Sequence, residues 1–260
     1  MILNILLPKR HEAGFSLVEM AIVIIILGFV LGALLMPLQA QRQQLAQSQT
    51  ENTLEIAKKA LLGFAQSKGR LPCPATANGL ENPIGGTAAC AMQLGYLPAA
   101  TLGIQPTDAN GFAVDAWNNP IMYAVAQNSA VTVPTNPITP DFTINSLTDG
   151  MNVVGIANLT PELRVCKSAT GITGTACSGG VESNYLINNA VAVIYSLGPT
   201  GAQASGGADE SANPKVPTSS ESVFVSHEPS QAAGNEFDHM MVWISPYVLY
   251  NAMIEAGQLH

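Results

Sequence analysis

The pattern of hydrophobic and polar positions divides the chain into a uniformly apolar N-terminal segment and a long remainder of short apolar runs. Residues 20–38 carry no charge and no strongly polar side chain. A helix of about 20 apolar residues crosses a bilayer core of about 30 Å. We therefore predict that residues 15–38 form a transmembrane helix, with the carboxylate of Glu19 at its rim.

The helical pattern continues beyond this segment but becomes amphipathic. Apolar residues recur at spacings of three and four, which is typical of a helix with one buried face: Leu54, Ala57, Leu61 and Phe64. Gly69 and Pro72 then predict the end of the helix. We expect one helix over residues 15–67, about 80 Å long at 1.5 Å per residue, followed by a globular head over residues 68–260.

Short apolar runs separated by Gly, Pro and Asn predict strands in the head: 121–125, 130–133, 151–156, 185–196, 223–225 and 240–244. Asn188 and Asn189 interrupt the longest run, so we expect a bulge or an early end there. Ser245 followed by Pro246 predicts the start of a short C-terminal helix. The expected fold is α+β, with the long helix packed on a small antiparallel sheet.

Composition limits the classes of function. The formal net charge is −8 and becomes −9 without residues 1–14, where eight basic side chains face seventeen acidic ones. A nucleic-acid binder normally has a basic face, so we infer no specific nucleic-acid partner. The sequence has no Gly-x-Ser-x-Gly elbow, no His-Glu-x-x-His and no phosphate loop. With no nucleophile placed beside a base, we expect no enzyme.

Four cysteines lie in the head, in two loops rich in Gly or Asn. They are Cys73 and Cys90 in the first loop, and Cys166 and Cys177 in the second. Neither pair has the two-residue spacing of a zinc ribbon or a thioredoxin motif. Four cysteines allow three pairings, and we favour the pairing of neighbours because each loop is short. Such disulfide-stapled loops suit a domain that folds outside the cytoplasm.

The N-terminal segment resembles a known processing signal. Lys9 and Arg10 precede a contiguous motif at the head of the apolar helix: Gly14, Phe15, Ser16, Leu17, Val18 and Glu19. This arrangement is similar to the class III leader of type IV pilins and type II secretion pseudopilins. The resemblance implies that a membrane-embedded prepilin peptidase cuts after Gly14, which removes the leader 1–14, and that Phe15 is then N-methylated.

The same resemblance implies a location and partners. The processed chain would cross the bacterial inner membrane once, and an inner-membrane assembly platform would then add it to a periplasmic or cell-surface filament. Its other partners would be further pilin or pseudopilin subunits. The mature chain, at 246 residues, is large for a principal subunit, which favours a minor one. The sequence leaves open whether the filament is a pilus, a secretion pseudopilus or a DNA-uptake fibre.

The N-terminal segment has two other interpretations. A secretory signal peptide has an apolar region of only about 7–15 residues and ends at a small-residue cleavage site. A plain signal anchor explains the apolar run and the two basic residues on its cytoplasmic side. It gives no reason for Gly14 and Glu19 at their spacing. A membrane-anchored periplasmic binding or sensing module is therefore the alternative function.

Glu19 is the residue that we expect to direct assembly. A carboxylate entering a bilayer costs about 2.5–3.5 kcal/mol on insertion scales, so it normally signals a partner. The resemblance implies that Glu19 pairs with the amino terminus of Phe15 in a neighbouring subunit. In a low-dielectric environment, leaving either charge unpaired would be costly. The alternative is a rim carboxylate that reaches up to water.

The head also shows a looser resemblance to the major pseudopilin group. Asp115, Trp117, Asn119 and Pro120 are similar to its Asp-x-Trp-x-Asn-Pro turn, which we expect to be a packed turn. The segment 195–201 resembles its Ser-x-Gly-x-x-Gly loop, and 237–243 its closing acidic-then-apolar strand. The cysteine-bearing loops and a separation of about twenty-five residues between Glu210 and Phe237 depart from that pattern.

Three acidic residues lie near Gly-rich loops and form the metal candidate of the head: Asp209, Glu210 and Asp238. The resemblance implies calcium, which requires hard oxygen ligands. The ligands would have to converge across the inserted segment. The alternative is a solvated acidic loop without an ion. The sequence indicates no other cofactor, and His227, His239 and His260 are scattered along it.

Overall fold

The computed structural model describes residues 14, 16–127, 142–146, 149–203 and 206–260. The chain forms two compact units, Met1–Leu45 and Ala46–His260. The second unit contains the C-terminal part of the long helix as well as the sheets, so it starts earlier than the head expected from the sequence. The predicted strand at 130–133 lies outside the described residues.

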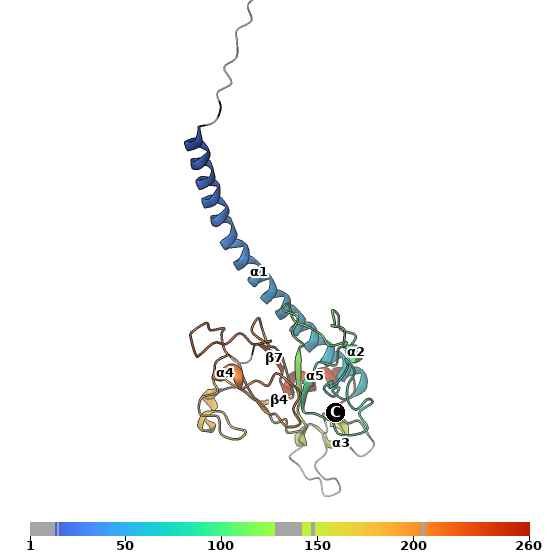
Figure 1. The fold of residues 1–260 in the computed structure, drawn as a ribbon. Helices are drawn as coiled ribbons and strands as arrows, with labels where there is room; N and C mark the ends of the chain where they lie inside the picture. Colours follow the sequence, from blue (N-terminus) through green and yellow to red (C-terminus); the bar gives the residue numbers. More distant parts are fainter. Residues whose placement is uncertain (1–13, 15, 128–141, 147–148, 204–205) are drawn as a thin grey trace, which may run out of the picture. The chain divides into compact units, whose positions relative to one another are not determined.

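The long helix α1 runs over Leu17–Lys68 (Figure 1). Its apolar stripe is buried in the second unit, where Leu54, Ala57 and Leu61 belong to the main core. The helix ends at Gly69, which has a φ of +71° and whose N–H donates to the Ala65 carbonyl at 2.8 Å. A left-handed residue of this kind is a common helix stop because glycine adopts it without steric cost.

A four-stranded antiparallel sheet forms the centre of the second unit. Its strands are β1 (Leu94–Tyr96), β2 (Met122–Val125), β5 (Ala192–Ser196) and β7 (Met240–Ile244), in the order β1-β2-β5-β7. Every residue of β2 and β5 is buried. The helix α5 (Pro246–Glu255) lies beside the C-terminal part of α1 (Figure 1), where Gln66 Nε2 donates to the Ala252 carbonyl at 3.1 Å.

A second, three-stranded sheet corrects the expectation of one antiparallel sheet. It consists of β3 (Leu163–Cys166), β4 (Tyr185–Ala190) and β6 (Val223–Val225), in the order β4-β3-β6. β3 pairs antiparallel with β4 but parallel with β6. The register between β3 and β4 shifts opposite the segment that contains Asn188 and Asn189, which is where the sequence predicted a bulge.

Short helices and turns complete the fold. The α-helices are α2 (Ala99–Leu102), α3 (Met151–Val154) and α4 (Ala208–Ser211), and the 3₁₀ turns are η1 (Ile156–Asn158), η2 (Ser178–Gly180) and η3 (Glu182–Asn184). The strand predicted at 151–156 is wrong, because α3 and η1 occupy it. Gly150 and Gly155 flank α3 with φ values of +117° and +76°, and these turns break the extended conformation that a strand needs.

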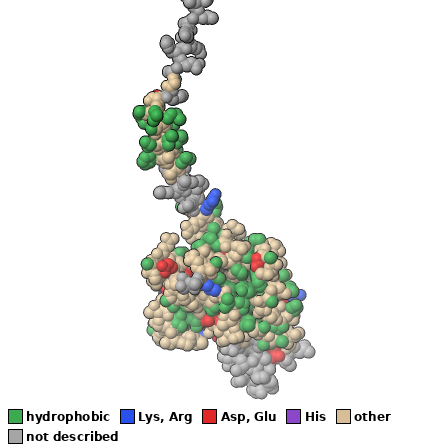
Figure 2. Space-filling model, in the orientation of Figure 1, with side chains coloured by type: hydrophobic (Ala, Val, Ile, Leu, Met, Phe, Trp, Pro, Cys, Tyr) green, Lys and Arg blue, Asp and Glu red, His purple; other side chains and the backbone are tan. Residues whose placement is uncertain are grey.

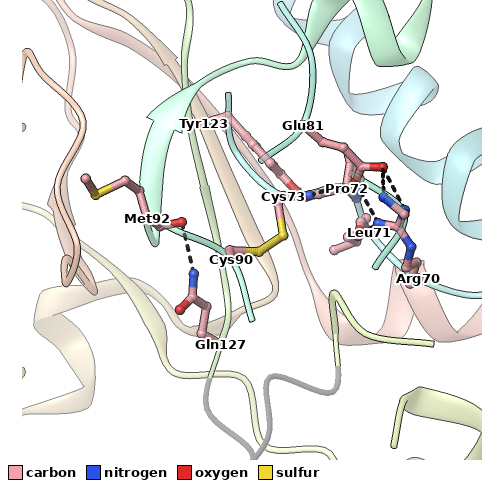
Figure 3. The surroundings of a disulfide bond; sticks show 10 residues. Arg70, Leu71, Pro72, Cys73, Glu81, Cys90, Met92, Tyr123 and Gln127 are labelled. Carbon is pink, nitrogen blue, oxygen red and sulfur yellow. Dashed lines mark hydrogen bonds and ion pairs between the residues drawn. A yellow bond between two sulfur atoms is a disulfide. The ribbon is translucent and has the colours of Figure 1, made fainter. Parts of the chain in front are cut away.

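Two disulfides hold the loops, and they join sequence neighbours. Cys73 pairs with Cys90, and Cys166 with Cys177. The first lies close to a buried ion pair, Arg70–Glu81, whose two hydrogen bonds are both 2.7 Å long (Figure 3). The second lies in a small separate core with three apolar residues of β6 and the following loop: Val223, Val225 and Phe237.

Candidate functional site

The N-terminus of α1 carries the processing motif and a helix cap. Gly14 is exposed, and Phe15 lies outside the described residues. The N–H of Ser16 donates to Glu19 Oε2 at 3.1 Å, and the N–H of Val18 donates to Ser16 Oγ at 3.3 Å. This reciprocal arrangement is close to a capping box, and the sequence carries the corresponding Ser-x-x-Glu spacing. Glu19 therefore stabilises the start of its own helix.

The helix that follows is apolar on all sides. Twelve large hydrophobic side chains of its first turns are exposed: Leu17, Val18, Met20, Ile22, Val23, Ile24, Ile25, Ile26, Leu27, Phe29, Val30 and Leu31. Figure 2 shows hydrophobic side chains over the visible face of this part of the helix. A helix with this composition is normally covered by protein or lipid. Within the described part of the chain, no helix meets the length and apolarity required of a membrane span.

Two of the three motifs of the looser resemblance, the turn at 115–120 and the loop at 195–201, meet in the head. The carboxylate of Asp115 is buried and accepts hydrogen bonds from the N–H of Trp117 at 2.9 Å and of Asn119 at 2.8 Å. Ser196 Oγ donates to Asp115 Oδ2 at 2.6 Å. Asn119 Nδ2 donates to the Gly198 carbonyl at 2.7 Å. Asp115 and Trp117 thus form a packed turn that holds the loop after β5, as expected.

Asp209 lies apart from the other two candidate calcium ligands, Glu210 and Asp238. Asp209 and Glu210 are adjacent on α4, but Asp209 faces the loop of the second disulfide. Its Oδ1 accepts from Ser168 Oγ at 2.9 Å and from the N–H of Ala169 at 2.5 Å, and its Oδ2 lies 3.0 Å from His227 Nε2. This corrects the grouping of Asp209 with the other two acids.

Glu210 and Asp238 do come together, with a histidine that the sequence did not single out. Glu210, Asp238 and His239 each offer one metal-binding atom, and these atoms lie within 4.8 Å of one another. Glu210 Oε1 accepts from Thr200 Oγ1 at 2.9 Å and lies 3.6 Å from His239 Nε2. Asp238 Oδ2 accepts from the N–H of Thr200 at 3.0 Å.

Burial sets the electrostatics of this cluster. The exposed fraction is 0% for Glu210 and 2% for His239, so Glu210 does not lie in a solvated acidic loop. Burial and a hydrogen bond with Asp238 raise the pKa of Glu210. Burial lowers the pKa of His239 to about 4, so the imidazole is neutral at pH 7. Two carboxyl groups therefore face a neutral ring, and among the described residues neither forms an ion pair with a lysine or arginine.

Comparisons with known proteins find one feature. Residues 9–35 match the prokaryotic N-terminal methylation motif. The chain thus carries a class III prepilin leader of the type IV pilin and pseudopilin kind, which confirms the resemblance at its N-terminus. Neither the curated proteins nor the solved structures include a match to this chain.

Proposed function

We propose that the chain is a minor structural subunit of a type IV pilus or a type II secretion pseudopilus, and not an enzyme. Prepilin peptidase removes residues 1–14 and Phe15 is methylated at its new amino group. The observation that carries this proposal is the match of residues 9–35 to the methylation motif, and α1 begins within this segment at Leu17.

The processed chain is stored in the bacterial inner membrane through residues 15–38, and the assembly platform then moves it into a filament. The charge-free run 20–38 and the exposed apolar side chains of α1 support this step. In lipid, and later against the helices of other subunits, these side chains leave water. About 25 cal/mol is gained for each Å² of apolar surface that does so.

Glu19 acts twice in this scheme. In the single chain its carboxylate caps α1 through the N–H of Ser16. In the filament it pairs with the methylated amino group of Phe15 in a neighbouring subunit, which sets the axial register of the two helices. Removing either partner leaves a buried charge, which costs about 3–5 kcal/mol.

A minor role agrees with the size of the head. The chain devotes a second sheet and a disulfide-closed loop to it, through β3, β4 and β6 and the Cys166–Cys177 bond. The net charge of −9 without the leader gives this head no electrostatic basis for holding nucleic acid.

Mass spectrometry of the N-terminus tests the proposal. The protein is purified from cells that possess a prepilin peptidase, and from a matched strain without it. We expect a chain that begins with N-methylated Phe15 in the first strain and an intact leader in the second. A chain that keeps Met1 in both strains contradicts the proposal and favours a membrane-anchored binding or sensing module.

A further inference from the structure

We propose that Glu210, Asp238 and His239 form a binding site for a divalent transition-metal ion of the zinc type. The site lies in the head, where Asp238 and His239 immediately precede β7 and Glu210 belongs to α4. It is independent of the processing motif at the N-terminus.

The distances fit ligands of one ion better than hydrogen-bonded partners. Glu210 Oε1 and His239 Nε2 are 3.6 Å apart, which is too long for a hydrogen bond. Two ligands at about 2.0–2.1 Å from a tetrahedral ion lie about 3.4 Å from each other. One atom from each of the three residues lies within 4.8 Å of the other two, so small movements of these side chains would bring all three onto a single ion.

Three buried atoms at this place have no hydrogen-bond partner outside the cluster: Glu210 Oε2, Asp238 Oδ1 and His239 Nε2. A buried polar atom without a partner is costly, and several at one place need an explanation. One divalent ion between two carboxylates and a neutral imidazole supplies a partner to each residue. It also balances the charge of the two carboxylates.

Glycine backbone closes the space around both carboxylates. A Cβ added at Gly206 would lie 1.3 Å from Glu210 Oε2, and one at Gly198 would lie 2.6 Å from Asp238 Oδ1. Neither position tolerates a side chain while the carboxylates stay in place. The two loops therefore hold the oxygens in a fixed cradle instead of leaving them free to turn toward water.

The donor set selects the class of ion. Calcium takes 6–8 oxygen ligands, and with Asp209 bound to Ser168 and His227 the cluster offers too few. One imidazole nitrogen with two carboxylate oxygens is a set that suits zinc and its neighbours in the first transition row. The ion inferred here therefore differs from the calcium that the sequence suggested.

Asn213 controls the ring of His239. Its Oδ1 accepts from the N–H of Val225 at 2.8 Å and its Nδ2 donates to the Val225 carbonyl at 2.9 Å. These bonds fix the amide, so Nδ2 is the atom that faces His239 Nδ1 at 3.1 Å. In the ion-free chain Nδ1 thus accepts, and the ring proton sits on Nε2.

Binding at Nε2 moves the ring proton to Nδ1, and the amide of Asn213 must turn to accept it. Outer partners of this kind tune metal affinity by about 10- to 100-fold. Asn213→Asp places an acceptor opposite Nδ1 and keeps one for the N–H of Val225. We expect this variant to bind the ion more tightly, an effect that a purely structural Asn213 would not produce.

The test uses the full chain in detergent with its disulfides intact, because all four cysteines are then paired and offer no thiolate to the ion. Zn²⁺ and Co²⁺ are the probes. We expect one ion per chain, a visible absorption band typical of tetrahedral Co²⁺, and a Tm that rises by about 5–10 °C at 100 times the Kd. His239→Gln should lose the band and the shift.

Two further variants keep the test decisive. His227→Gln removes the other histidine that contacts a carboxylate, and it should bind Co²⁺ like the parent chain. Asp238→Asn alters a half-buried ligand and should weaken binding at least tenfold even if His239→Gln fails to fold. The proposal is overturned if the parent chain binds no ion, or if His239→Gln or Asp238→Asn binds the ion as tightly as the parent chain. It is also overturned if Ca²⁺ raises the Tm while Zn²⁺ and Co²⁺ do not.

Discussion

At the scale of single residues, Arg70 and Glu81 show how the head uses a buried charge pair. Both side chains are 5% exposed. The Glu81 carboxylate accepts two bonds from Arg70 and further ones from the N–H groups of Cys73 at 3.3 Å and Gly85 at 3.1 Å. Tyr123, whose hydroxyl donates to the Pro72 carbonyl at 3.0 Å, lies beside the same segment (Figure 3).

Removing one partner of this pair should lower the free energy of unfolding much more than removing both. We expect Arg70→Met to lower the free energy of unfolding by about 3–5 kcal/mol, because it leaves a buried carboxylate without its cation. The double variant Arg70→Met/Glu81→Leu should recover most of that loss. Denaturant unfolding of the four chains of this cycle measures the coupling. Equal losses in the single and double variants would contradict this account.

The same pair predicts a dependence on pH. Burial raises the pKa of Glu81, but the hydrogen bonds and charge of Arg70, with the N–H groups of Gly85 and Cys73, outweigh it and leave the pKa lowered. Below about pH 4.5 the unfolded chain therefore binds more protons than the folded one. The stability that Glu81 contributes is full above that pH and is lost as pH falls through the folded pKa.

Urea unfolding between pH 7 and pH 3 checks this dependence. We expect the stability difference between the parent chain and Arg70→Met/Glu81→Leu to stay constant down to about pH 4.5. Below that pH the free energy of unfolding of the parent chain should fall relative to that of the double variant. A difference that does not change with pH would show that Glu81 does not titrate in this window.

Glu19 allows its two roles to be separated. Glu19→Gln keeps a side-chain oxygen for the N–H of Ser16, since glutamine also serves in capping boxes, but it removes the charge. Glu19→Ala removes both. If pairing with a neighbour governs assembly, both variants should enter filaments on the order of 100-fold less than the parent chain. A Gln variant that assembles normally would mean that the cap alone is needed.

At the scale of elements, the two disulfides stabilise different parts of the head. They close loops with sequence separations of 17 and 11 residues, so each should contribute about 3 kcal/mol by the loop-closure argument. Cys166 and Cys177 lie in the small core with Val225 and Phe237. Losing this bond should therefore loosen β3 and β6 more than the four-stranded sheet.

Hydrogen exchange distinguishes these elements. In Cys166→Ser/Cys177→Ser, the amide of Val225 should lose protection while that of Ile194, in the centre of β5, keeps it. Cys73→Ser/Cys90→Ser is the matched control, because Cys73 and Cys90 belong to the main core. If both double variants reduce the protection of β5 equally, the head unfolds as one unit and the two cores do not differ in local stability.

The elements that could be predicted are those with a strong local signal. The apolar periodicity of α1, the apolar runs of β2 and β7 and the Ser-Pro start of α5 each predict the element that they form. β1 and β3 could not be found this way. They hold three and four residues, and pairing with distant strands decides their conformation. The strand proposed at 151–156 failed because four apolar residues do not distinguish a strand from a helical turn.

The acidic residues on α4 likewise could not be placed from the sequence. Asp209 and Glu210 are neighbours in the chain, but successive side chains on α4 point about 100° apart. They therefore reach different loops. His239 could be placed beside Glu210 only through the path that brings the start of β7 to α4. Glu19 is the opposite case, because the Ser-x-x-Glu spacing that caps α1 was present in the sequence.

At the scale of the whole molecule, the division into two units separates the apolar segment from the structure that folds around the sheets. The second unit begins at Ala46, and its core uses only residues from Leu54 onward. The second unit also uses α1 at Thr50, which is fully buried and whose Oγ1 accepts from the N–H of Ala116 at 3.2 Å.

These contacts predict where the chain can be shortened. A fragment that starts at Ala46 should fold and stay monomeric without detergent, because it keeps Thr50 and the whole buried stripe of α1. A fragment that starts at Arg70 lacks that stripe and leaves the sheet exposed on one side, so it should aggregate or remain unfolded. Circular dichroism and size-exclusion chromatography of the two fragments compare them directly. If the shorter fragment folds as well as the longer one, α1 contributes to the filament alone and not to the stability of the head.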